Sequence, residues 1–123
     1  MSLVKRIDSV FLPVRNLKHS EQWYKNLFGL EPVFRSDDGR YVGFRFPQEE
    51  VIQTALTLYQ VTDIPKLPGQ LFNFYTEDVY ATYEALKDKG ANVSAIHTAE
   101  GMTFFDMTDP DGHEIGVVTF PEK

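Results

Sequence analysis

The segment Phe11-Leu12-Pro13-Val14-Arg15-Asn16-Leu17 decides the fold, because its succession of strand, cap and helix returns later in the chain. Apolar residues alternate over 7–14, which predicts a β-strand, and the proline inside it favours a sheet edge or a bulge. Asn16 is typical of a helix N-cap. The pattern that follows predicts a helix over 17–28, which Gly29 ends.

The same succession begins again at a predicted strand over 70–76. Asp78 is the second N-cap, and the helix expected over 79–89 ends at Gly90. The two caps are 62 positions apart and the two glycines 61 positions apart. Self-similarity at one fixed spacing indicates an internal duplication.

Each predicted helix is followed by three short β-rich runs. They lie at 31–35, 40–46 and 51–60 after the first helix, and at 93–97, 103–107 and 114–119 after the second. Asp38-Gly39 and Asp109-Pro110-Asp111-Gly112 are turn signals between runs. Residues 61–69 contain two prolines and one glycine without periodicity, which indicates a connector.

These elements predict one α+β domain over 1–123. It contains two tandem βαβββ modules, at about 5–60 and 70–120, and the connector 61–69 joins them. A helix covers one face of each predicted sheet, and a second copy of the module is able to cover the other face.

The composition of the chain excludes several classes of function and partner. The net charge of −6 repels a nucleic-acid backbone and disfavours anionic membranes, so neither is expected as a partner. The chain has no cysteine, which excludes disulfides and thiolate metal sites and fits a reducing compartment. With no apolar run of membrane-spanning length and no signal peptide, we expect a cytoplasmic protein. Aromatic residues make up 14% of the chain, enough to line a ligand cavity as well as a core.

The sequence resembles the vicinal oxygen chelate superfamily, which includes glyoxalase I, extradiol dioxygenases and bleomycin-resistance proteins. The segments that carry the resemblance are 11–17, Ser20 with 23–30, 77–79 and 105–113. The resemblance implies a glyoxalase-like fold, in which the paired modules form an open, strongly curved mixed sheet around a cavity. It also implies a homodimer.

Enzymes of this superfamily hold a divalent metal through His, Gln and Glu side chains on the first and last strand of each module. The matching positions here are Ser9, about Ala55, Leu71 and Gly116. None of these side chains is a good ligand for a catalytic divalent ion. We therefore expect no metal cofactor at the usual site.

The resemblance also places a ligand-binding cavity on one sheet face. Its predicted lining is Ser9, Phe11, Ala55, Thr57, Leu71, Asn73, Glu114 and Gly116. Glu114 is two residues from Gly116, so both side chains point to the same face of a strand. Glu114 is either a solvated residue beside a turn or a carboxylate that serves as general base or cation anchor. His113 is adjacent to it and would point to the opposite face.

Two functions fit these observations. The first is a metal-free protein that binds an unidentified small molecule, as bleomycin-resistance members of the superfamily do. The alternative is an enzyme, a glyoxalase-like (lactoylglutathione lyase-like) lyase or isomerase or a dioxygenase, with a divalent metal at a displaced site.

Overall fold

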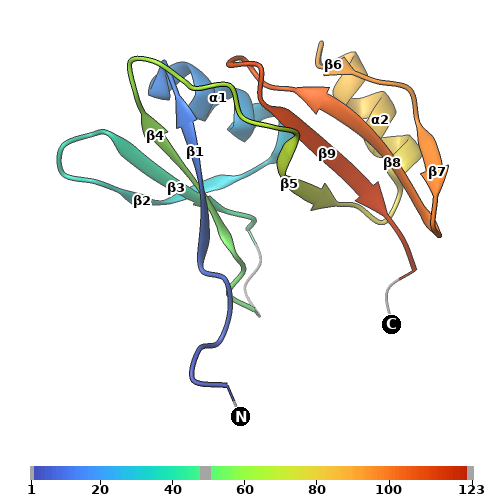
Figure 1. Cartoon of the computed structure of the whole chain (residues 1–123), viewed down its shortest axis with the longest axis horizontal. Helices are drawn as coiled ribbons and strands as arrows, with labels where there is room; N and C mark the ends of the chain where they lie inside the picture. Colours follow the sequence, from blue (N-terminus) through green and yellow to red (C-terminus); the bar gives the residue numbers. More distant parts are fainter. Residues whose placement is uncertain (1, 48–50, 122–123) are drawn as a thin grey trace. The chain divides into compact units, whose positions relative to one another are not determined.

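The computed structural model describes residues 2–47 and 51–121. Residues 1, 48–50 and 122–123, which the predicted domain 1–123 includes, lie outside the described part. The chain divides into two compact units, Met1–Pro65 and Lys66–Lys123. Each unit has one helix on one face of its own sheet (Figure 1). No helix among the described residues is long and apolar enough to cross a membrane.

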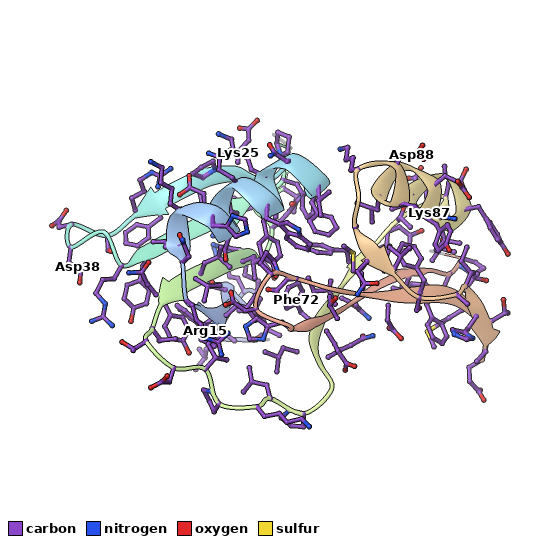
Figure 2. All side chains as sticks on the ribbon, turned by 90° about the horizontal axis from the view of Figure 1, so that it is seen from above. Arg15, Lys25, Asp38, Phe72, Lys87 and Asp88 are labelled. Atoms are coloured by element: carbon purple, nitrogen blue, oxygen red, sulfur yellow. The ribbon has the colours of Figure 1, made fainter. Side chains whose placement is uncertain are left out.

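The first unit forms a four-stranded sheet. Its elements are β1 (Ser9–Val14), α1 (Leu17–Phe28), β2 (Glu31–Arg35), β3 (Tyr41–Arg45) and β4 (Ala55–Gln60). The strand order is β1-β4-β3-β2; β1 and β4 are parallel, whereas the other neighbours are antiparallel. Figure 2 shows Asp38 at the tip of the β2–β3 hairpin and Lys25 on α1.

The second unit repeats this order. Its elements are β5 (Gln70–Tyr75), α2 (Val79–Asp88), β6 (Asn92–Val93), β7 (His97–Ala99), β8 (Met102–Thr108) and β9 (Glu114–Thr119). The strand order is β5-β9-β8-β6, with β5 and β9 parallel and β7 also paired to β8. The predicted α+β class with two tandem βαβββ modules is confirmed.

The predicted strand over 93–97 is wrong in its interior, because β6 ends at Val93 and β7 begins at His97. Ser94 explains the interruption. Its hydroxyl accepts a hydrogen bond from the Asp106 backbone N–H at 2.9 Å, in the place where a carbonyl of a regular ladder would accept. A serine side chain that bonds the backbone in this way competes with strand pairing.

The predicted strand over 51–60 begins only at Ala55. Hydrogen bonds from side chains fix the residues that precede β4. Thr54 Oγ1 donates to the Ile7 carbonyl at 2.6 Å, and Arg45 Nε donates to the Gln53 carbonyl at 2.8 Å. Side-chain hydrogen bonds therefore replace ladder pairing along this segment.

Both predicted N-caps are confirmed. Asn16 Oδ1 accepts the His19 N–H at 3.0 Å, and Asp78 Oδ1 accepts the Ala81 N–H at 3.0 Å. Each of these side chains satisfies a backbone donor that the first helical turn leaves without an intrahelical acceptor. Gly29 ends α1 at φ 69°, a left-handed conformation that glycine adopts without a steric penalty.

The core of each unit lies between its helix and the facing side of the sheet. Among the described residues, the apolar side chains that are at most 2% exposed are Leu12, Val14, Tyr24, Leu30, Val42, Phe44 and Leu58 in the first unit, and Val79, Leu86, Phe105, Met107, Ile115 and Val117 in the second. These residues alternate along the strands, as expected for a sheet with one covered face. We call the opposite side of each sheet its open face.

One partly buried ion pair joins α1 to β2. Arg35 donates to both carboxylate oxygens of Glu21, at 2.8 and 2.5 Å. The Glu21 side chain is only 11% exposed, whereas that of Arg35 is 57% exposed. The hydrogen bond from Arg35 is the main reason why the pKa of Glu21 lies below its ordinary value of 4.5.

Because the pKa of Glu21 is lower in the folded state, the ion pair stabilises the fold at pH values above the pKa of the unfolded state. This stabilisation is lost as the pH falls through the pKa of the folded state. We expect Glu21→Gln to lower the free energy of unfolding at neutral pH, and the gap from wild type to shrink below pH 4.5. Urea unfolding between about pH 7 and pH 3 measures both effects. Glu31→Gln, at an exposed carboxylate of β2, is the control. A gap for Glu21→Gln that is the same at every pH would contradict this account.

Candidate functional site

A row of four residues crosses the open face of the first sheet. Strand register places Phe11 beside Thr57, Thr57 beside Gly43 and Gly43 beside Phe34. Phe11 and Phe34, at the ends of the row, are 58% and 56% exposed, whereas Thr57 is buried. Because paired strands lie about 4.8 Å apart, the row presents two small residues between two exposed rings. We call these four residues the aromatic row.

Ser9 lies next to the aromatic row and contacts its centre. Ser9 Oγ and Thr57 Oγ1 are 2.6 Å apart, and Ser9 Oγ donates to the Val10 carbonyl at 3.3 Å. A hydroxyl has one proton to donate and two lone pairs to accept with. The pair therefore keeps lone pairs that can accept a hydrogen bond from a bound molecule.

Gly43 allows the centre of the aromatic row to be compact. A Cβ atom at position 43 would lie 3.3 Å from Thr57 Oγ1 and 3.6 Å from Phe34 Cβ. Tyr41 and Tyr59 form the next pair along the same face, and their rings stack at 5.8 Å with 21° between the planes. The open face thus carries aromatic surface on several sides of a small hydroxyl-lined centre.

The structure brings together the four predicted cavity residues of the first unit. Ser9 and Ala55 are register partners, as are Phe11 and Thr57, and all four share the open face. Sequence reasoning missed Gly43 and Phe34. A β-bulge shifts the β2–β3 register between Pro32 and Phe34, so simple alternation along β2 does not give the face of Phe34. The Asp38-Gly39 hairpin was the signal that could have placed β2 beside β3.

The open face of the second sheet is more polar. Gly116 pairs with Asn73 on β5 and with Asp106 on β8. The Gln70 side chain lies over Gly116, since a Cβ atom at position 116 would be 2.8 Å from both Cδ and Nε2 of Gln70. Gln70 Nε2 donates to Asp106 Oδ1. The glycine therefore provides the space in which this amide meets the carboxylate, a contact that sequence reasoning missed.

The remaining predicted residues of the second unit lie on or near this face. Glu114 is exposed and pairs with Gln70 and with Thr108. Leu71 is 42% exposed and falls where the β5–β9 register shifts. Glu114 shares a face with Gly116, as predicted from their spacing, whereas its neighbour His113 is buried.

A second group of potential ligand atoms lies in the turn between β8 and β9. One ligand atom from each of Asp109, Asp111 and His113 falls within 4.8 Å of the others. The turn itself uses this group: Asp109 Oδ1 accepts the backbone N–H of Asp111 at 2.9 Å and that of His113 at 2.8 Å. Asp109 is thus the residue that organises the turn. Sequence reasoning treated this segment only as a turn and did not group the three side chains.

Comparison with known proteins identifies the family. The model of the Glyoxalase/Bleomycin resistance protein/Dioxygenase superfamily matches residues 6–117. The chain therefore belongs to this superfamily. No curated protein matches the chain significantly.

Solved structures agree on the fold. TnmS3, an antibiotic binding protein from Streptomyces sp. CB03234, is 18% identical, with a TM-score of 0.83 over 98% of this chain and 100% of that one. A superfamily member from Sphaerobacter thermophilus DSM 20745 is 21% identical, with a TM-score of 0.80 over 96% and 99%. Lactoylglutathione lyase from Agrobacterium tumefaciens is 23% identical, with a TM-score of 0.74 over 96% of both chains. At these identities the likeness shows the fold alone.

The four residues that the family resemblance matches to metal ligands, with the second at about Ala55, do not fit a divalent metal. In the first unit they are the hydroxyl of Ser9, already bonded to Thr57, and the methyl group of Ala55. In the second they are the apolar Leu71 and Gly116, and the Gln70 side chain covers the glycine. Catalytic divalent ions depend on imidazole and carboxylate ligands. No chemical step through a metal at these positions follows from this structure.

Substitutions of Asp109 test whether this residue only stabilises the turn or also binds a metal ion. We expect Asp109→Ala to lower the free energy of unfolding by about 1–3 kcal/mol, because two backbone donors lose their acceptor. Asp109→Asn keeps an oxygen at Oδ1 and should remain close to wild type in urea unfolding. Titration with Mg²⁺, Mn²⁺, Ni²⁺ or Zn²⁺, followed by thermal unfolding, completes the test. An ion that stabilises wild type but not Asp109→Asn would contradict the purely structural role.

Proposed function

We propose that this protein binds a small aromatic molecule on the open face of the first sheet, without the aid of a metal. The observation that carries the proposal is the aromatic row, in which two exposed phenylalanines flank a small centre. Exposed rings at fixed positions on a sheet present apolar surface to a ligand at little entropic cost.

The favourable free energy of binding comes first from the burial of apolar surface. Covering exposed ring surface contributes about 25 cal/mol per Å². Offset-stacked and edge-to-face ring pairs add about 0.5–1.5 kcal/mol each. Phe11 and Phe34 stand three strand spacings apart, so a flat ligand above Thr57 and Gly43 would contact both rings only if it has several fused or linked rings.

Polar contacts would then orient the ligand. The Ser9–Thr57 hydroxyl pair offers an acceptor at the centre of the row, so the proposal favours a ligand that carries a hydroxyl, amine or amide donor. Within the second unit, Glu114 on the open face of its sheet is separately proposed as a carboxylate that anchors a cationic group. The other proposed cavity residues of the second unit stay Leu71, Asn73 and Gly116, as the family resemblance implies. We propose a homodimer as the working form, as the family resemblance implies.

One of the compared proteins is consistent with binding as the function. TnmS3 is an antibiotic binding protein, and its fold matches this chain over nearly the whole length. The alternative, a lyase or dioxygenase with a displaced metal, has Asp109, Asp111 and His113 as a candidate ligand group among the described residues. Asp109 Oδ1 is already the acceptor for two backbone donors there, so we do not propose an enzyme.

A thermal-shift screen of flat aromatic compounds, run with and without EDTA, tests the proposal. A compound at about 100 times its dissociation constant adds about 2.7 kcal/mol of stability. We expect Phe11→Ala and Phe34→Ala each to weaken a hit about tenfold in isothermal calorimetry, equivalent to about 1.4 kcal/mol. EDTA should change nothing.

The matched control is Tyr80→Ala, which removes an aromatic ring of α2 that is 61% exposed. It should leave the affinity unchanged. Loss of binding in EDTA, or hits that bind both phenylalanine variants as tightly as wild type, would show that the aromatic row is not the site.

A further inference from the structure

A separate cleft lies in the first unit where β1 and β4 end. Its volume is about 470 Å³, and its lining residues are Arg15, Arg40, Gln60, Val61 and Thr62. It shares no lining residue with the aromatic row. Since β1 and β4 are parallel neighbours, their carboxyl ends meet at this edge of the sheet. Arg15 is labelled in Figure 2.

Backbone pairing brings the two arginines together. Arg15 follows the last residue of β1, and the Val61 N–H donates to the Val14 carbonyl at 2.9 Å. Arg40 precedes β3, and its carbonyl accepts the Gln60 N–H at 2.9 Å. The strand register, rather than a flexible loop, therefore places both guanidinium-bearing residues beside the same stretch of chain.

The Arg40 side chain is held across the end of β4. One of its guanidinium nitrogens donates to the Gln60 carbonyl at 3.2 Å. A guanidinium carries five N–H donors in a planar fork, so this bond leaves further donors for a ligand. Asp38 is close to Arg40 in the chain, and its carboxylate accepts from the Ser36 hydroxyl and the Arg40 backbone N–H. The Ser36 hydrogen bond is the main reason why the pKa of Asp38 is lowered, and the charge of Arg40 contributes a smaller part, so Asp38 offsets some of the Arg40 charge.

The local charge opposes that of the whole chain. The net charge is −6, yet the cleft lining has two arginines and, within the described ranges, no carboxylate. The first turn of α1 borders the cleft, because the Leu17 N–H donates to Gln60 Oε1 at 2.9 Å. The positive end of the helix dipole adds to the arginine charges there. The Thr62 hydroxyl supplies one more donor.

We propose that this cleft binds an oxyanion, a phosphate or carboxylate group carried by a small ligand. Two guanidinium forks and a hydroxyl match the acceptor-only oxygens of such a group. The proposal is independent of the aromatic row and of any metal. It assigns a binding role to Arg15, Arg40 and Thr62.

The test uses inorganic phosphate and succinate as separate probes on the whole protein, at constant ionic strength. Amide chemical shifts measured by NMR during each titration should move saturably around Arg15, Arg40 and Thr62. The probe that binds more tightly identifies the group. We expect Arg15→Gln and Arg40→Gln each to raise its dissociation constant at least about fivefold, because each removes a charge-assisted contact. Added salt should weaken binding.

Lys87→Gln is the matched control, since it removes one exposed positive charge from α2 in the other unit. It should leave the dissociation constant unchanged. An equal loss in Lys87→Gln would show that only net charge matters and would overturn the proposal. Binding unchanged in both arginine variants, or no saturable shifts with either probe, would overturn it as well. If Arg40→Gln fails to fold, the dissociation constants of Arg15→Gln and Thr62→Val are compared with that of Lys87→Gln instead.

Discussion

The parallel pairing of the first and last strand of each unit is the constraint on which the rest of the structure depends. β1 pairs with β4 and β5 with β9 in the same direction. Parallel neighbours require a long crossover, and here it contains a helix and the intervening strands. The helix covers one sheet face and leaves the other open. The same pairing fixes the register that aligns Phe11 with Thr57, and it brings the carboxyl ends of β1 and β4 together at the arginine cleft.

Duplication gives two sheets of the same topology with different open faces. In the first unit the face is aromatic, and its polar centre is a pair of hydroxyls. In the second, Gln70 crosses Gly116 to reach Asp106. A buried apolar face is similar in both, because packing on the helix restricts it to residues that exclude water. The open face carries no such restriction, so the two copies are free to differ there.

The sequence predicted the parts of the fold that depend on local chemistry. Asn16 and Asp78 mark both helix starts because a cap acts within one turn. The parts that depend on pairing between strands were harder to predict. Phe34 falls on the open face only because of a bulge, and Ser94 interrupts a strand through a contact with β8. For the same reason Gln70 was missed, since its importance lies in a contact with a residue 36 positions away.

Two of the positions that the family resemblance matches to metal ligands take part in contacts with neighbouring side chains. A carboxylate at position 116 would need space that the Gln70 side chain now fills. Likewise, a ligand at position 9 would compete with the hydrogen bond between Ser9 and Thr57. Ser9 and Gly116 therefore take part in packing that satisfies neighbouring polar groups, and a metal ligand introduced at either position would leave a partner without its contact. Such mutual dependence supports the proposal that this protein binds a molecule through the side chains of a sheet face.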